Sequence, residues 1–274
     1  MADAKQGTKQ TAHKVEDSEW LERAIRVGLW AYGLVHLLIA WLALQLAFGH
    51  SSGAPSQQGA MQQLAKESYG TFLLWVIALG FLALSIWQAF EALWGHHKED
   101  GSKRTFKRVG SAARVVVYLA LGYSALKTAL GEKSGSSEDR LTSQLMGLPF
   151  GRFLVGLVGV VIIFVGGYLI SKAVRKSFKK DMQPQATSGS TGTTVVRLGQ
   201  VGYTAKGISL GVVGGLFVWA AWTYDADKAG GLDVALRTLL DASVGPWLLA
   251  AVAVGIACFG IYCFFWARYA DTSS

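Results

Sequence analysis

We single out four ionisable side chains within long apolar segments of this sequence, a setting in which charge is costly and often functional. His36 is in the middle of the first apolar segment, where it can form a packing hydrogen bond or handle protons. Arg114 and Lys206 lie about one to two turns inside their segments, so both can extend to the headgroup layer and bind lipid phosphate. Glu91 is near the end of the second segment and can pair with either cation. These four residues are our candidates for a polar or lipid-headgroup site.

Uncharged polar residues accompany them. Gln45 and Gln88 fall in the first and second apolar segments. Together with the three basic candidates, they can either line the polar path of a small transporter or channel, or form hydrogen bonds between helices.

Asp225 and Asp227 follow the fifth segment, where they can bind a cation weakly or cap the next turn.

No catalytic or cofactor-binding pattern accompanies these residues. The sequence contains no nucleotide-binding loop, no Cys-x-x-Cys and no His-Glu-x-x-His, and its serines occur without the strand–turn–helix setting of a nucleophile elbow. His36 has no second histidine at ligand spacing, which argues against a metal or haem site. We therefore predict a protein that is not an enzyme and that carries no cofactor or metal ion.

The candidates are positioned by six apolar segments of about 20 or more residues, each long enough to cross a bilayer as a helix. The composition, 51% hydrophobic and 16% charged, is typical of a membrane protein. The net charge of +8 comes from basic residues in tails and loops beside these segments, so we assign it to membrane topology and expect no nucleic-acid partner. The predicted helices are approximately 23–48, 70–94, 109–130, 151–174, 199–224 and 245–269.

A two-helix unit recurs three times along the chain with a period of roughly 80 to 90 residues, too long for a solenoid. The shared positions are Arg26-Val27-Gly28 with Gly70, Arg108-Val109-Gly110 with Gly151, and Arg197-Leu198-Gly199 with Gly245. Each unit enters the membrane from the same side. We therefore predict an all-α integral membrane bundle of six helices, built from three parallel two-helix repeats with pseudo-threefold symmetry.

In these features the chain resembles the family called domain of unknown function 1206, bacterial membrane proteins with repeated two-helix units. The resemblance extends from about residue 21 to residue 269. Its most similar stretches are Gly33-Leu34-Val35-His36-Leu37-Leu38, residues 59–65 and residues 222–231. It implies the fold but no activity, because the family has no established one, and no catalytic residue follows from it.

The predicted order along the chain includes segments outside the helices. Polar, aperiodic sequence at the N-terminus is typical of disorder, and the Pro, Ser, Thr and Gly tract of the fourth loop is typical of a flexible linker. Short amphipathic helices are expected at 58–66 and 232–240. The full division is a disordered N-terminus at 1–18, repeat one at 19–95, repeat two at 96–180, a flexible linker at 181–196, repeat three at 197–269 and a tail at 270–274.

Helix packing has one specific candidate. Gly207, Gly211 and Gly215 lie four residues apart in the fifth predicted helix, and we predict that this stripe lets a neighbouring helix approach closely. Gly211→Leu should then be destabilising.

Basic residues are concentrated before the first helix and in the second and fourth loops, so these segments should face the cytoplasm with both termini inside. We expect a multi-pass protein of the bacterial plasma membrane, in contact with membrane lipids and able to bind another membrane protein. The pattern favours a non-enzymatic scaffold, accessory subunit or lipid-binding module. The alternative is a small transporter or channel.

Overall fold

The computed structural model describes residues 19–49, 53–95, 101–132, 150–223, 231–241 and 243–270; the predicted disordered N-terminus and residues 271–274 of the tail lie outside them. Six long helices make up most of the described chain, and each is long and apolar enough to cross a membrane. The predicted all-α membrane fold is therefore confirmed. The long helices are α2 (Glu19–Ala47), α4 (Gly70–Leu93), α5 (Gly101–Ala129), α7 (Gly151–Val174), α8 (Gly189–Thr223) and α10 (Gly245–Tyr269).

Two short helices fall within the predicted amphipathic loops and lead directly into long ones. They are α3 (Gln57–Ala65) and α9 (Leu232–Leu240). A β-carbon on Gly70, where α4 begins, would lie 1.7 Å from the carbonyl oxygen of Leu64. A β-carbon on Gly245, where α10 begins, would lie 1.8 Å from the carbonyl oxygen of Leu240. Glycine is required at both positions because the short helix ends against the start of the long one.

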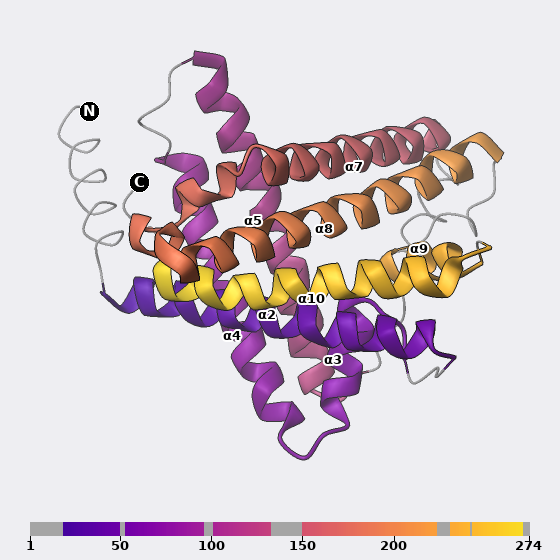
Figure 1. Ribbon diagram of the computed structural model, residues 1–274, viewed down its shortest axis with the longest axis horizontal. Coiled ribbons are helices and arrows are strands. Elements are labelled where there is room, and N and C mark those ends of the chain that lie inside the picture. The colour runs from indigo at the N-terminus through magenta and orange to yellow at the C-terminus, as the bar shows by residue number, and fades with distance from the viewer. Residues whose placement is uncertain are drawn as a thin grey trace.

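The helices pack in the order α5, α4, α2, α10, α8, α7, each against the next. Figure 1 shows α7, α8, α10 and α2 side by side, with α4 and α5 crossing this row steeply. The most extensive interfaces join different repeats, namely α4 with α5, α7 with α8, and α10 with α2. The second helix of each repeat thus packs against the first helix of the next, the order expected of a threefold ring.

The ring is not closed, and the predicted pseudo-threefold arrangement is not confirmed. Helix α2 packs on α4 and α8 packs on α10, but α5 and α7, the two helices of repeat two, form no comparable interface in the described residues. They are the two edges of the packing order instead. Only 17% of the most apolar stretch of each is buried, against 39% or more in the other four helices.

Glycines bring α7 and α8 into close contact. A β-carbon on Gly207 would lie 2.7 Å from the carbonyl oxygen of Gly166. A β-carbon on Gly214 would lie 2.6 Å from the carbonyl oxygen of Gly159. The two backbones therefore approach each other at positions seven residues apart on each helix.

This contact corrects the membership of the predicted glycine stripe. A β-carbon on Gly211 or Gly215 would meet nothing within 4 Å. Positions four apart rotate by about 40° per step around a helix of 3.6 residues per turn, whereas positions seven apart drift by only about 20°. The glycines whose β-carbon positions point at α7 are accordingly Gly207 and Gly214, while Gly211 presents its backbone nitrogen, 3.1 Å from where a β-carbon on Gly166 would lie.

Residues 181–196, expected to form a flexible linker, carry regular structure that packs on the bundle. A short 3-10 helix, η1 (Ser177–Asp181), ends at its first residue, a second, η2 (Pro184–Thr187), follows within it, and α8 already starts at Gly189. Phe178, Met182 and Ala186 are all buried. These three residues, spaced four apart, anchor the segment, a feature that the polar composition around them conceals.

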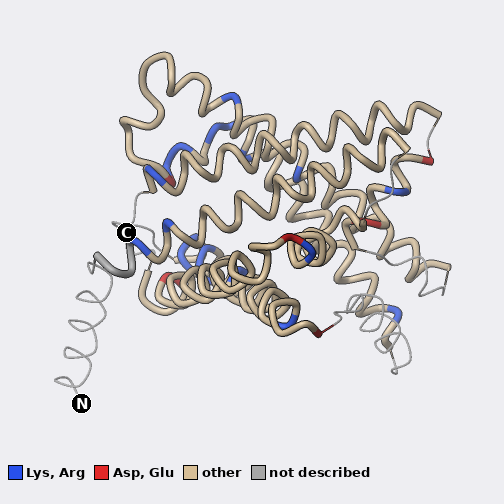
Figure 2. The backbone as a smooth tube through the Cα atoms, turned by 90° about the horizontal axis from the view of Figure 1, so that it is seen from below, with Lys and Arg blue, Asp and Glu red and all other residues tan. Residues whose placement is uncertain are grey.

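Lysine and arginine residues gather at the end of the molecule where α2 begins and α10 ends (Figure 2). We call this the basic end. Helix α9 lies at the opposite end (Figure 1). Basic residues lie in the first turns of α2, at the ends of α7 and α10, in the segment after α7 and in the first part of α8. They are Arg23, Arg26, Lys172, Arg175, Lys176, Lys179, Lys180, Arg197 and Arg268.

Candidate functional site

Lys206 is held inside the bundle rather than at its edge. Because α8 begins at Gly189, ten residues before its predicted start, Lys206 lies at mid-helix, about 14 Å deeper along the axis than Arg197. Its side chain crosses to α2, where Nζ donates a hydrogen bond to the Tyr32 hydroxyl and lies 3.3 Å from Nε2 of His36. We expected Lys206 to extend to the headgroup layer. In the structure its side chain instead points to Tyr32 and His36 inside the bundle.

The hydrogen bonds of His36 define its role toward the lysine. Nδ1 lies 2.8 Å from the backbone carbonyl oxygen of Tyr32, one turn earlier in α2. A carbonyl oxygen can only accept, so Nδ1 carries the proton and Nε2 is left with a lone pair. The Lys206 ammonium can donate to that lone pair. His36, 5% exposed, is thus both a packing residue and an acceptor for the buried cation.

Aromatic rings surround this pair. Nζ of Lys206 lies 4.6 Å from the ring centroid of Tyr32 and 4.3 Å from that of Phe259, distances at which cation–π attraction operates. The ring of Tyr32 also packs edge-on against Phe81 and Tyr118, with centroids 6.1 and 6.0 Å away. Tyr32 therefore joins α2, α4, α5 and α10 at the point that Lys206 reaches from α8.

The charge of Lys206 has no carboxylate opposite it among the described residues. Ion pairs in that part of the chain include Lys127 with Glu132 at 3.0 Å and Lys172 with Asp181 at 2.6 Å, neither of which involves Lys206. Nor does the described part of the chain gather three metal-ligating side chains in one place. The ammonium group is satisfied by hydrogen bonds and aromatic faces, and no carboxylate in the described part of the chain neutralises it.

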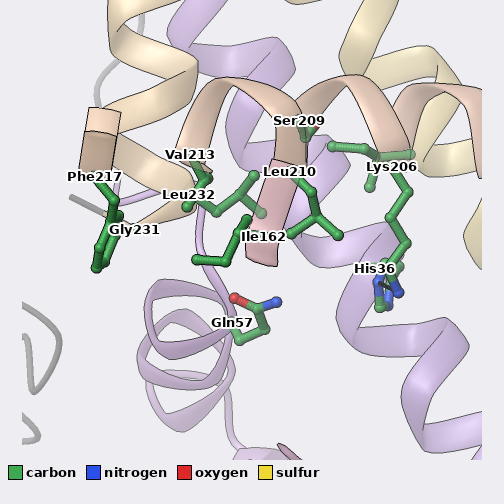
Figure 3. Close-up of a pocket in the computed structure, with 11 residues that line it drawn as sticks. His36, Gln57, Ile162, Lys206, Ser209, Leu210, Val213, Phe217, Gly231 and Leu232 are labelled. Atoms are coloured by element: carbon green, nitrogen blue, oxygen red, sulfur yellow. Dashed lines mark hydrogen bonds between the residues drawn. The ribbon is translucent and has the colours of Figure 1, made fainter. Parts of the chain in front are cut away.

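A pocket of about 270 Å³ opens beside Lys206. Figure 3 shows Lys206 and His36 at one end, Phe217 and Gly231 at the other, and mostly apolar side chains between them. Residues 206, 209, 210, 213 and 217 of α8 form one helical face of the pocket. The remaining lining residues, from α2, α3, α7, α10 and the start of α9, are His36, Gln57, Ile162, Gly231, Leu232 and Ile256.

Toward the basic end, rings fill the space next to Phe259. Tyr203 packs against it with centroids 5.2 Å apart, and Phe178 packs on Tyr203 at 5.4 Å. Tyr262 completes the cluster, 5.6 Å from Tyr203 and fully buried. Lys206 therefore lies between a packed aromatic cluster on one side and the pocket on the other.

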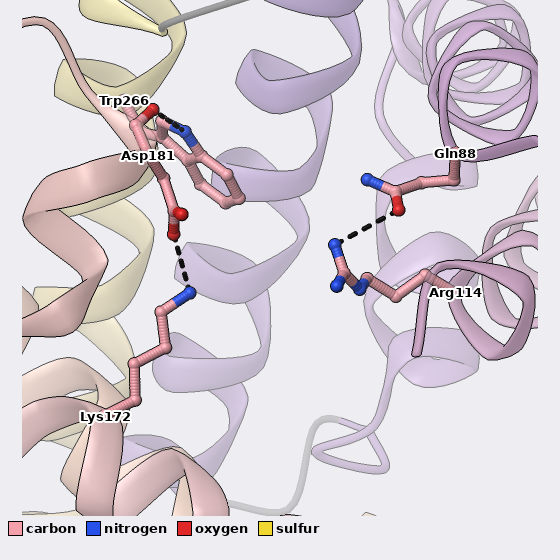
Figure 4. Close-up of polar contacts among 5 residues, drawn as sticks. All are labelled: Gln88, Arg114, Lys172, Asp181 and Trp266. Atoms are coloured by element: carbon pink, nitrogen blue, oxygen red, sulfur yellow. Dashed lines mark hydrogen bonds and ion pairs between the residues drawn. The ribbon is translucent and has the colours of Figure 1, made fainter. Parts of the chain in front are cut away.

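Polar contacts hold η1 against this cluster. Asp181 pairs with Lys172 of α7, and its carbonyl oxygen accepts a hydrogen bond of 3.1 Å from Nε1 of Trp266 in α10 (Figure 4). The next turn is fixed by a 2.9 Å bond from the backbone nitrogen of Gln183 to the carbonyl oxygen of Tyr269. The segment after α7 is thus tied to two helices.

Arg114 belongs to a second polar group. Its Nη1 donates a 3.1 Å hydrogen bond to Oε1 of Gln88, which is 2% exposed at the interface of α4 and α5 (Figure 4). Neither residue lines the pocket at Lys206. The five residues proposed for a continuous polar path therefore include one pair, His36 with Lys206, that shares a pocket and another, Gln88 with Arg114, that lies elsewhere.

The remaining sequence candidates lie away from the pocket. Glu91 is 6% exposed near the end of α4, with its carboxylate beside Gly95. Gln45 is half-buried near the opposite end of α2 from Arg26. Asp225 and Asp227 lie outside the described residues.

Sequence reasoning missed the aromatic partners of Lys206. Tyr32 had a usable signal, because it lies four residues before His36 and so on the same helical face. Phe259 had none, since α10 is apolar almost throughout. The anchoring group of Lys172, Asp181 and Trp266 was hidden in the same way, by residues that meet only in the folded chain.

Comparisons with known proteins agree with this architecture. "Uncharacterized protein YxxB" of Bacillus subtilis (strain 168) is 29% identical over 251 residues, covering 91% of each chain. No solved structure matches the chain. The model of a family described as Domain of Unknown Function (DUF1206) matches three times, at residues 27–95, 109–176 and 201–270, which are the three repeats read from the sequence. The chain therefore belongs to the DUF1206 family of proteins.

Proposed function

We propose that this chain is a non-enzymatic, multi-pass protein of the bacterial cytoplasmic membrane that binds an anionic, lipid-like molecule inside its helix bundle. The observation that carries the proposal is the Lys206 ammonium group at one end of an apolar pocket. Among the roles expected from the sequence, scaffold, accessory subunit and lipid-binding module, this geometry favours the third.

Charge balance is the physical argument. A lysine near the centre of a membrane helix costs about 2.5–3.5 kcal/mol on insertion scales, and such residues are usually paired. Tyr32 and His36 give Lys206 hydrogen bonds but no negative charge. A bound anion would neutralise the ammonium group, and the apolar part of the same molecule would occupy the rest of the pocket.

Native mass spectrometry of the full chain in lipid nanodiscs tests this function. We expect an anionic amphiphile to accompany the wild-type protein, and its occupancy to fall by about ten-fold or more in Lys206→Met, equivalent to about 1.4 kcal/mol of binding free energy. The substitution keeps the length of the side chain and removes its charge. Lys127→Met, which removes a more exposed lysine from the end of α5, should retain the ligand. Equal occupancy in wild type and Lys206→Met would refute the proposal.

We also propose that the basic end faces the cytoplasm, because short loops rich in Lys and Arg are retained on that side. In a variant whose two native cysteines are replaced by alanine, single cysteines at Ser52, Ser136 and Asp227 should react with an impermeant thiol reagent added to whole cells. Single cysteines at Ser102 and Ser188 should react only after the cells are opened. The opposite labelling pattern would exclude this orientation.

A further inference from the structure

We infer that the ligand is a single-chain monocarboxylate, with its carboxylate at Lys206 and its hydrocarbon chain lying along α8 toward Phe217. This inference rests on the proposed function and narrows it to one chemical class. Three properties of the pocket lead to it: the number of hydrogen-bond donors at its charged end, its volume, and the apolar face that continues from Lys206.

The charged end offers few donors. An ammonium group has three N–H donors, and Lys206 directs two of them to the Tyr32 hydroxyl and to Nε2 of His36, which leaves one for a ligand. Ser209 donates its hydroxyl hydrogen to the carbonyl oxygen of Ala205 at 3.0 Å, so it can only accept. Among the described lining side chains, the amide of Gln57 is the other donor, and it lies midway along the pocket rather than at Lys206 (Figure 3). One unit of positive charge and one free N–H donor at Lys206 match a singly charged carboxylate.

A phosphate group fits this end poorly. A phosphomonoester carries about −1.5 to −2 charges at neutral pH and three strong acceptor oxygens. Binding it here would leave acceptor oxygens without partners and negative charge without compensation, and both are costly in an apolar surrounding. Phosphate recognition also favours the planar fork of arginine, whereas Lys206 is a point charge.

The pocket has room for one hydrocarbon chain. Its volume of about 270 Å³ lies just below the range of about 300–1,000 Å³ that is usual for small-molecule sites, too small for a diacyl lipid. Lys206 and Phe217 are eleven residues apart on α8, which corresponds to about 16 Å along the helix. The side chains between and around them that would contact the hydrocarbon chain are Ile162, Leu210, Val213, Leu232 and Ile256.

The first experiment compares three probes of equal chain length. Dodecanoate, dodecyl phosphate and dodecanol are each titrated against the full chain, and binding is measured by native mass spectrometry. We expect one dodecanoate per chain, bound about ten-fold more tightly than either other probe. The preference should disappear in Lys206→Met and persist in Lys127→Met.

A second variant tests where the hydrocarbon chain of the ligand lies. Val213→Phe adds volume midway along the pocket and leaves Lys206 untouched, so it should weaken dodecanoate about ten-fold while butanoate, which occupies only the charged end, binds as to wild type. Thermal unfolding of the variant confirms that it is folded. If the folded variant loses affinity equally for dodecanoate and butanoate, the hydrocarbon chain does not lie along this part of the pocket, and the inference is overturned.

The outcomes separate this inference from the function on which it rests. If dodecyl phosphate binds as tightly as dodecanoate and depends equally on Lys206, the carboxylate inference fails and anion binding stands. If dodecanol matches dodecanoate, or if no anion depends on Lys206, both fail.

Discussion

Replacing Phe178 by alanine should lower the free energy of unfolding by about 3–5 kcal/mol, the usual cost of truncating a buried aromatic side chain. The Phe178 side chain is 0% exposed, and its ring centroid lies 5.4 Å from that of Tyr203 and 5.5 Å from that of Tyr262. Both tyrosines belong to the aromatic cluster on the basic side of Lys206. The truncation leaves a cavity in this cluster, because Asp181 and Gln183 still bond to α7 and α10 and keep residues 177–187 from closing it.

Thermal unfolding in detergent measures this loss, with Phe164→Ala as the matched control. Phe164 is in α7 and 64% exposed, so its truncation removes the same atoms without opening an internal cavity. Limited proteolysis gives a second readout, because residues 177–187 should become a cleavage site when their anchor is removed. Equal stability of the two variants would mean that the segment after α7 is as loosely attached as its composition suggests.

The fate of this segment shows what composition can and cannot reveal. The Ser, Thr, Pro and Gly content of residues 181–196 predicts a flexible linker, and the buried Phe178 precedes that range. The structure nevertheless holds the segment on the bundle, with three buried apolar side chains four residues apart and polar contacts from Asp181 and Gln183. The polar partners Lys172 and Asp181 were equally uninformative beforehand, because a basic loop at a membrane surface has a sufficient explanation in topology.

The membrane helices and their repetition were predictable because both are properties of the chain itself. A span requires about 20 apolar residues, and an internal repeat requires only a period. The family match at three segments confirms the repeats. Closure of the ring was not predictable in the same way, since it depends on whether α5 meets α7, and each of these helices has an apolar stretch long enough to face lipid instead.

The candidate site was half predictable. Lys206 and His36 were identified individually because an ionisable residue within an apolar run is rare. Their meeting was not, because the depth of Lys206 depends on where α8 begins, and that start was placed ten residues too late. The pocket depends on side chains from α2, α3, α7, α8, α9 and α10, and no pattern within one segment indicates such a convergence.

A second large effect is expected at the contact between α7 and α8. Gly214→Ala should lower the free energy of unfolding by about 1–3 kcal/mol, the usual cost of overpacking a tight interface. Its β-carbon would lie 2.6 Å from the carbonyl oxygen of Gly159 and 2.8 Å from the backbone nitrogen of Ile163. Both atoms are backbone, so no side chain can rotate away, and relief requires the helices to separate. In a membrane little hydrophobic force opposes that separation, because van der Waals packing between the helices supplies much of their association.

Gly211→Ala on the same helix is the control, because it adds the same methyl group where nothing lies within 4 Å. Alanine favours the helix over glycine by up to about 1 kcal/mol, so this variant should unfold at the same temperature as wild type or slightly higher. The comparison tests the packing face directly, since the two substitutions are identical and only three residues apart. A stability loss at Gly211 with none at Gly214 would support the glycine stripe with a spacing of four that was expected from the sequence. The contact face with a spacing of seven between α7 and α8 would then have to be abandoned.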